Sequence, residues 1–143
     1  MRALLDVNVL IALLDAGHVH HSLAMDWLES AARHGWASCP ITQNGCIRIM
    51  SHPGYPNPFP ASQVAERLEE AAAGEEHEFW PDEISLLDTQ VFNWSYILAH
   101  REVTDVYLLA LAVHNRGRLV TFDRGIGIEA VKNANNNNLL ILA

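Results

Sequence analysis

The opening run of the chain constrains its fold most strongly, because an apolar stretch ends on one carboxylate and a second apolar stretch follows at once. Residues 3–5 predict a short buried strand, Asp6 ends it, and residues 8–14 predict a helix. In an open α/β sheet, such a strand-to-helix corner lies at the carboxyl edge, where ligands and catalytic groups gather. This pattern makes Asp6 a candidate functional residue.

The same alternation of short strands and helices continues along the chain and predicts the fold class. Further strands are expected at residues 36–39, 77–80, 118–122 and 139–142, with helical spacing between them. This order predicts an α/β fold, a three-layer α/β/α sandwich around a mostly parallel central sheet. A length of 143 residues suits one domain, which we place at residues 1–143.

The expected helices begin at residues that commonly cap helices. Thr42 is expected to cap one helix, Ser62 to start a second that runs to Gly74, and Thr104 to cap a third. The third is apolar on nearly every side, which is typical of a helix packed deep in a core. Residues 84–99 predict a short helix or turn followed by a helix.

Composition narrows the classes of function. The formal net charge of −8 argues against a broad basic surface for nucleic acid, but an acidic pocket can still meet phosphates through bound cations. No apolar run approaches the roughly 20 residues that span a bilayer, and no secretory signal is recognisable. We therefore expect a cytoplasmic protein.

Three carboxylates share a similar context. Asp6 and Asp123 each follow a predicted strand, and Asp105 opens the buried helix. Singly, each has an ordinary explanation: a helix cap for Asp6, a favourable helix dipole for Asp105 and a turn for Asp123. Together they would converge on one edge of the sheet, where a hard cation such as Mg²⁺ or Mn²⁺ would offset their repulsion. Such a site can activate water for attack on a phosphodiester, which indicates a nuclease.

The motifs around these acids resemble those of PIN-domain ribonucleases, and most closely the VapC toxins of type II toxin-antitoxin systems. The resemblance rests on residues 4–10, 103–112 and 121–125, and also covers 18–28 and 39–48. It implies a PIN-like fold and a metal-dependent endoribonuclease that cleaves RNA by metal-activated water. Asp6, Asp105 and Asp123 would hold the Mg²⁺ or Mn²⁺. It also implies a homodimer and a cognate VapB-type antitoxin whose C-terminal segment blocks the pocket.

One departure from the family pattern bears on activity. VapC toxins usually carry Glu at the position that we match to Gln43, so Gln43 would stand among the catalytic residues without supplying charge. Metal affinity and turnover would both fall if the remaining acids do not compensate. The sequence leaves open whether Gln43 is a natural variant or an engineered weakening of a toxic protein.

Several other residues are candidates for supporting roles. Arg48, Arg116 and Arg124 are candidate contacts to RNA or phosphate, although ordinary surface roles fit them as well. Thr121 is close enough to Asp123 in sequence to form a hydrogen bond in the pocket. A histidine cluster at positions 18, 20 and 21 lacks the partners of a transition-metal site.

Two other functions compete with the nuclease. A PIN-like domain that binds RNA or antitoxin without cutting is favoured by the missing charge at Gln43. A receiver-like Mg²⁺-binding signalling module also gathers acids at a sheet edge, but it would need a second acid beside Asp6 and a suitably placed lysine. The only lysine is Lys132, late in the chain.

Overall fold

A computed structural model describes residues 1–143 and contains one five-stranded sheet. All neighbouring strands pair in parallel, in the order β3-β2-β1-β4-β5. This confirms the predicted α/β class with a parallel sheet. The strands are β1 (Ala3–Leu5), β2 (Trp36–Ser38), β3 (His77–Phe79), β4 (Arg118–Thr121) and β5 (Leu139–Ile141).

The order of the strands reverses at the centre of the sheet. From β1 the chain moves outward through β2 to β3, then crosses to β4 on the other side of β1 and ends at β5. In open α/β sheets, ligands bind at the carboxyl ends of the two strands that flank such a reversal. Here those strands are β1 and β4. A receiver-like module would follow the order 2-1-3-4-5 instead, so the topology excludes that alternative.

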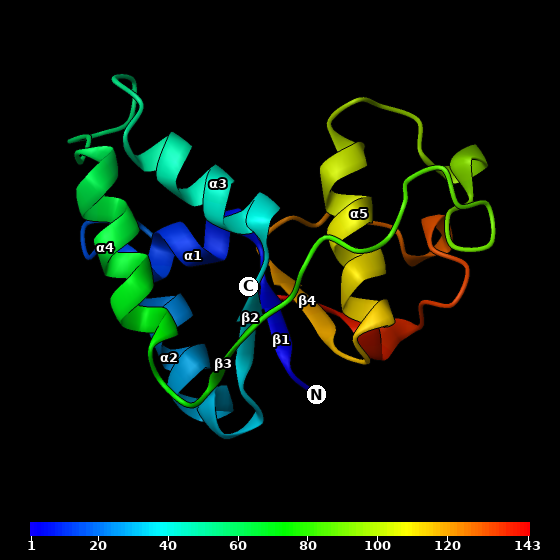
Figure 1. Cartoon of the computed structure of the whole chain (residues 1–143), viewed down its shortest axis with the longest axis horizontal. Helices are drawn as coiled ribbons and strands as arrows, with labels where there is room; N and C mark the ends of the chain where they lie inside the picture. The colour runs from blue at the N-terminus through cyan, green and yellow to red at the C-terminus, as the bar shows by residue number, and fades with distance from the viewer.

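Helices cover both faces of the sheet (Figure 1). One face carries α1 to α4, and the opposite face carries α5 together with the irregular segments of the second half of the chain. The helices are α1 (Val7–Leu14), α2 (His21–Ala31), α3 (Pro40–Met50), α4 (Ala61–Ala72) and α5 (Glu102–His114), with short 3₁₀ turns η1 (Ala32–His34), η2 (Trp94–Tyr96), η3 (Ile128–Ala130) and η4 (Asn136–Asn138). None of the helices is both long and apolar enough to cross a membrane.

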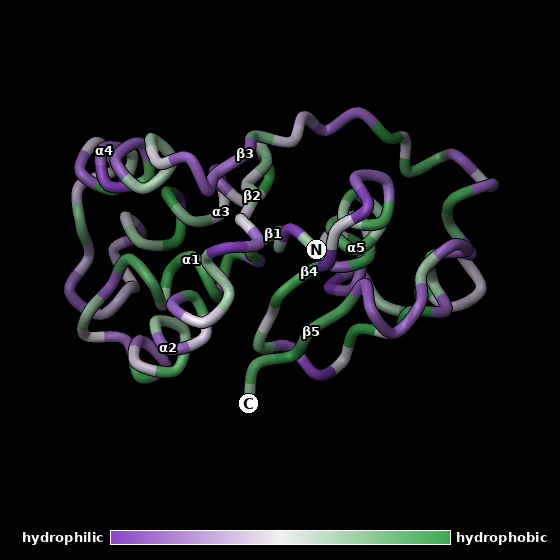
Figure 2. Tube along the Cα trace, turned by 90° about the horizontal axis from the view of Figure 1, so that it is seen from below, coloured by the Kyte–Doolittle hydropathy of each residue, from purple (hydrophilic) through white to green (hydrophobic).

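Alternation along the strands divides the core between these two faces. Leu4 packs on the α5 side, whereas its neighbours Ala3 and Leu5 pack on the α1 side. The α5 side takes the predicted all-round apolar helix, whose residues 106–112 are all buried. Hydrophobic colour also follows β4 and β5 where they run together in Figure 2. Central strands buried on both faces explain why their sequences contain almost no polar residue before the strand ends.

Three predicted helix features were wrong. Helix α3 begins at Pro40, whose missing N–H is harmless at the first helical position, and the Thr42 hydroxyl instead accepts a 3.0 Å hydrogen bond from the Cys39 N–H. Helix α4 begins at Ala61, after Pro60, and Ser62 makes no capping bond. Helix α5 begins at Glu102, so Thr104 lies inside its first turn rather than capping it.

The helix expected within residues 84–99 is absent. This segment forms turns and the single 3₁₀ turn η2, and it is tied to the opposite loop by a bridge between Phe92 and Val131. The Asn93 side chain accepts a hydrogen bond from the Ser95 N–H, an arrangement in which a short polar side chain competes with helix formation.

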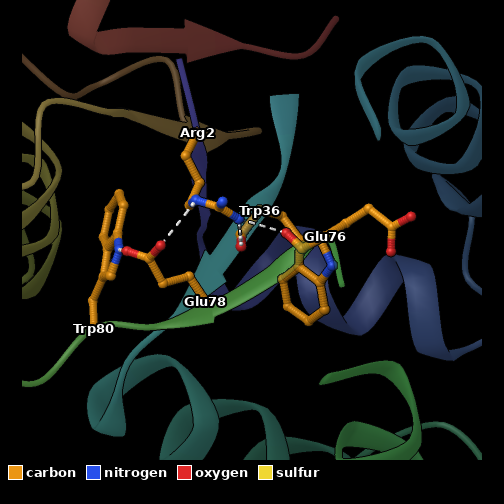
Figure 3. A network of polar contacts seen from close by, with 5 residues as sticks. All are labelled: Arg2, Trp36, Glu76, Glu78 and Trp80. Atoms are coloured by element: carbon orange, nitrogen blue, oxygen red, sulfur yellow. Dashed lines mark hydrogen bonds and ion pairs between the residues drawn. The ribbon is translucent and has the colours of Figure 1, made fainter. Parts of the chain in front are cut away.

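Arg2 joins three strands at the amino edge of the sheet (Figure 3). Its guanidinium donates to the carbonyl oxygens of Trp36 and Glu76 and pairs with the Glu78 carboxylate at 3.5 Å. The Trp80 indole N–H donates to the same carboxylate. Gly35 lies beneath Arg2 with φ +77°, and a Cβ there would come within 2.3 Å of Nη1. These contacts stabilise the amino edge of the sheet, which lies opposite the carboxyl edge where Asp6 ends β1.

Candidate active site

Asp6 is fixed at the point where β1 gives way to α1. Its Oδ1 accepts a 2.7 Å hydrogen bond from the Val7 N–H, which makes Asp6 the N-cap of α1. Its backbone N–H donates to the Val120 carbonyl on β4 at 2.9 Å. The side chain is only 6% exposed, and this burial raises its pKa although the bonds from Thr121 and Val7 lower it in part.

Thr121, the last residue of β4, connects Asp6 with Asp123. Its hydroxyl donates to Asp6 Oδ2 at 2.6 Å and accepts a hydrogen bond from the Asp123 N–H at 3.0 Å. Asn8 lies beside this pair, 3.5 Å from the Thr121 hydroxyl through Nδ2, and its Oδ1 accepts from the Phe122 N–H. Both oxygens of Asp6 are therefore held by the protein before any ligand arrives.

Asp105 completes the group from the other face of the sheet. It lies in the first turn of α5 and lines a cavity together with Asp6 and Asp123. Burial, followed by the charge of Asp6 and the neighbouring side chains of Asp123 and Glu102, raises the pKa of Asp105 to about 7. A carboxyl group whose pKa is raised in this way marks a place where negative charge lacks a compensating partner.

Three cavities meet at Asp105. The α3 cavity, of about 560 Å³, is lined by Asp6, Asn44, Arg48, Asp82 and Asp105 among others. The α1 cavity, of about 390 Å³, is lined by the three acids with Asn8, His18 and Tyr55. The α5 cavity, of about 440 Å³, is lined by Asp105 and Asp123 with Tyr96, Arg101, Glu102 and Gly127. The acids thus lie at a junction from which a substrate can extend in more than one direction.

Gln43 is not brought to this junction. Its Nε2 donates a 3.0 Å hydrogen bond to the Ser38 hydroxyl, which also bonds the His77 ring at 2.8 Å. It lines a separate cavity of about 220 Å³ with Trp36, Ile47 and Leu68. The neighbouring residue Asn44 lines the α3 cavity instead. The expectation that Gln43 takes the place of a fourth acid therefore needs correction, because it is the neighbouring polar residue Asn44 that lines a cavity with Asp6 and Asp105.

The candidate phosphate contacts are separated by the structure. Arg48 lines the α3 cavity with Asp6 and Asp105. Arg124 is exposed on the turn after Asp123 and lines none of the three cavities. Arg116 follows the far end of α5, about 16 Å along the helix from Asp105, and lines none of the three cavities, so its contact to RNA stays a prediction.

Sequence reasoning also missed several residues of the junction. Asp82 follows β3 much as Asp6 and Asp123 follow their strands, and that signal could have identified it. Burial raises its pKa. Arg101 and Tyr96 line the α5 cavity, but they belong to a region where the sequence shows no regular spacing. His18, set aside as a transition-metal ligand, lines the α1 cavity.

The donor chemistry of the junction fits a hard divalent cation. The three carboxylates offer oxygen ligands, which Mg²⁺ and Mn²⁺ prefer, and a bound cation would compete with the proton that the raised pKa of Asp105 favours. The three acids line one cavity, although no group of three or more His, Cys, Asp or Glu side chains is close enough to form a ready-made ligand set. The fit to a cation therefore rests on the residue types of this lining.

Comparisons with known proteins agree with this architecture. The sequence matches the PIN domain family over residues 3–132. It is 48% identical to ribonuclease VapC44 of Mycobacterium tuberculosis, over 99% of this chain and 100% of that protein. It is 42% identical to ribonuclease VapC39 of the same organism, over 91% of this chain and 94% of that protein.

Solved structures show the same fold at low sequence identity. The sarcin-ricin-loop-cleaving toxin VapC20 of Mycobacterium tuberculosis superposes with a TM-score of 0.58 and 12% identity, covering 81% of this chain and 85% of that one. VapBC2 of Rickettsia felis, solved bound to a DNA fragment from its promoter, gives a TM-score of 0.55 and 17% identity, covering 86% and 89%. The chain belongs to the PIN-domain family and, within it, to the VapC ribonucleases, the toxins of toxin-antitoxin systems.

Proposed function

We propose that this chain is a Mg²⁺- or Mn²⁺-dependent endoribonuclease that hydrolyses RNA phosphodiester bonds, with residues 1–143 acting as one PIN domain. The observation that carries the proposal is the meeting of Asp6, Asp105 and Asp123 at the reversal of the strand order. Burial and the charge of Asp6 raise the pKa of Asp105, which shows that the ionised carboxylates are destabilised at this position. A cluster of acids with such a raised pKa is a candidate functional site.

Asp6, Asp105 and Asp123 would hold the cation. When bound, it would supply positive charge to the phosphodiester and activate water as the attacking group. The chain's own residues prepare the site: Val7 N–H and the Thr121 hydroxyl fix the orientation of Asp6, and Thr121 also anchors the backbone of Asp123. Such fixed ligand geometry avoids reorganisation when the substrate arrives.

A second candidate function is binding of RNA or antitoxin without cleavage. It is favoured by the residues on α3 that face the acids, because neither Asn44 nor Gly45 supplies a fourth negative charge there. Asp82 lines the same cavity and offers a charge from the end of β3. We therefore favour a cutting enzyme, whether or not Gln43 is the natural residue.

The partners follow from membership of the family. We propose a VapB-type antitoxin as the regulator, whose C-terminal segment would block the junction, and a homodimer as the assembled toxin in the cytoplasm. The support for these partners is the 48% identity to ribonuclease VapC44 over 99% of this chain.

Asp6→Asn tests the proposed activity. Asn can still accept the Val7 N–H bond, so the variant should fold, but it loses one charge of the cation site. Cleavage of total RNA in a Mg²⁺ titration should be abolished, whereas Asp26→Asn, which changes an exposed acid on α2, should cleave normally. Full activity of Asp6→Asn overturns the nuclease. RNA binding by wild type without cleavage at any Mg²⁺ or Mn²⁺ concentration supports the second candidate.

A further inference from the structure

The α5 cavity contains residues beyond the acids that would hold the cation. Asp105, Asp123 and Glu102 form the acidic part of its lining, and the rest comes from Tyr96, Arg101, two glycines and apolar neighbours. Its volume of about 440 Å³ lies within the roughly 300–1,000 Å³ of cavities that hold small organic groups. It therefore has room for part of a substrate whose reacting bond lies at the acids.

Arg101 gives this cavity a cation without a partner. The two ion pairs of the structure are Arg2 with Glu78 and His114 with Glu83, so Arg101 forms none. Its neighbour Glu102 is engaged elsewhere, because Oε2 accepts a 3.0 Å hydrogen bond from the Leu98 N–H. In a chain of net charge −8, a guanidinium left unpaired beside carboxylates is available for a phosphate.

Tyr96 gives the cavity an aromatic wall on a firm support. Tyr96 as a whole residue is 56% exposed, and the turn that carries it is pinned at Asn93, whose N–H donates a 2.9 Å hydrogen bond to the Ala130 carbonyl. Phe92, four positions before Tyr96, is 2% exposed and forms the bridge to Val131. An exposed ring held in place in this way can stack on a base without a large cost in ordering.

We propose that the α5 cavity is a nucleotide subsite of the enzyme, in which Arg101 binds an RNA phosphate next to the scissile one and Tyr96 stacks on the attached base. The inference rests on the proposed ribonuclease function. It adds the path that the RNA strand takes away from the cleavage site. Arg48 in the α3 cavity lies on the other side of Asp105 and would meet the strand where it enters. The substrate is then single-stranded RNA at this point, because a paired base cannot present its face to a tyrosine ring.

RNA fits this cavity better than a protein segment does. The most exposed leucines of this half of the chain, Leu87 and Leu98, do not line the cavity, so the cavity itself lacks the exposed apolar surface that a protein segment would bury. The cavity itself combines an unpaired cation, an aromatic ring and the acids of the proposed cleavage site. Those groups match phosphate, base and scissile bond in that order.

Binding measurements test the subsite apart from catalysis. The probe is a fluorescein-labelled, random-sequence RNA decamer, and every protein carries Asp6→Asn so that it does not cut. Arg101→Ala should weaken binding about tenfold and reduce the slope of log affinity against log salt by about 0.7, the value for one contact to a single strand. The control Arg33→Ala removes an exposed arginine from η1, at the amino edge of the sheet, and should leave both affinity and slope unchanged.

The aromatic role is tested at the same time. Tyr96→Phe keeps the ring and should bind as the parent does, whereas Tyr96→Leu keeps apolar bulk without the ring and should bind at least fivefold more weakly. In the background with Asp6 intact, sequencing of the cut ends should show that Tyr96→Leu alters base preference on one side of the cleavage site only.

The outcomes separate this proposal from the ribonuclease itself. Failure of the wild-type protein to cut RNA at any metal concentration overturns the ribonuclease, while the binding series still reports on the subsite. Cleavage by wild type with equal RNA affinity and salt slope in Arg101→Ala and Arg33→Ala overturns the subsite. Unchanged affinity in Tyr96→Leu also overturns it, because the ring would then not stack on a base.

Discussion

The Thr121 hydroxyl donates a 2.6 Å hydrogen bond to Asp6 Oδ2 across 115 positions of sequence. Thr121 is fully buried and Asp6 nearly so, and their strands β4 and β1 are neighbours in the sheet. The bond therefore joins the two strand ends at the reversal of strand order, where the carboxylates gather.

Thr121→Val should show how much this hydrogen bond contributes to the free energy of unfolding. Removing the hydroxyl leaves a buried carboxylate oxygen without its donor, which costs about 1–3 kcal/mol of unfolding free energy. Urea unfolding measures the loss, and Thr121→Ser, which restores a hydroxyl, should recover most of it. A Val variant as stable as wild type would show that Asp6 does not depend on this donor.

The pKa of Asp105 predicts how stability depends on pH. Since its folded pKa is raised from 3.8 to about 7, the folded state holds the proton more tightly than the unfolded chain does. This contribution to stability is fully present below about pH 4 and is lost as pH rises through 7. Without divalent cations, wild type should therefore lose stability between pH 4 and 7 relative to Asp105→Asn.

Urea unfolding in EDTA at several pH values measures that difference, and titrating groups far from Asp105 cancel between the two proteins. Adding Mg²⁺ above pH 7 should stabilise wild type, because the cation offsets the negative charge that Asp105 carries once its proton is lost, and should stabilise Asp105→Asn much less. Parallel pH profiles for the two proteins would contradict the raised pKa of Asp105.

The neighbours Gln43 and Asn44 should respond differently to an added charge. Asn44→Asp places a carboxylate in the α3 cavity with Asp6 and Asp105, so the Mg²⁺ concentration for half-maximal cleavage should fall by roughly tenfold. Gln43→Glu places its charge beside Ser38 in the separate cavity and should leave that concentration unchanged. A lower Mg²⁺ requirement in Gln43→Glu, with no change in Asn44→Asp, would instead place position 43 among the residues that hold the cation.

Helix phase explains why the sequence could not separate these two residues. Asn44 and Arg48 are four positions apart and share one face of α3, whereas Gln43 is turned by roughly 100° from Asn44. Choosing between them requires knowing how α3 lies against the sheet. That orientation depends on Gly45 and Val7, which are far apart in sequence but in contact in the fold.

The acids were easier to predict than their surroundings. Asp6 and Asp123 stand at the ends of buried strands, and parallel strands bring their carboxyl ends to one edge, so local pattern was enough. Tyr96 and Arg101 come from turns held by tertiary bonds, such as the bridge of Phe92 to Val131. The apolar residues of such a segment have no regular spacing that would define its structure, and the helix predicted there was wrong for that reason.

Gly45→Ala should test whether the fit of α3 against α1 positions the acid site. A Cβ at this position would lie 2.7 Å from Cγ2 of Val7, the residue directly after Asp6. Overpacking costs about 1–3 kcal/mol, offset by about 1 kcal/mol from the better helix propensity of alanine. The variant should be modestly less stable in urea and need more Mg²⁺ for cleavage, because α1 carries the cap residue Asp6.

Val7→Ala supplies the control, since it removes the methyl groups that the new Cβ would meet. Alone it should also destabilise the protein, by leaving a space between the helices. Combined with Gly45→Ala, the two losses should not add, because each change makes room for the other. Strictly additive losses, or a normal Mg²⁺ requirement in Gly45→Ala, would show that this contact is only packing and that Asp6 is held by Thr121 and Val7 N–H alone.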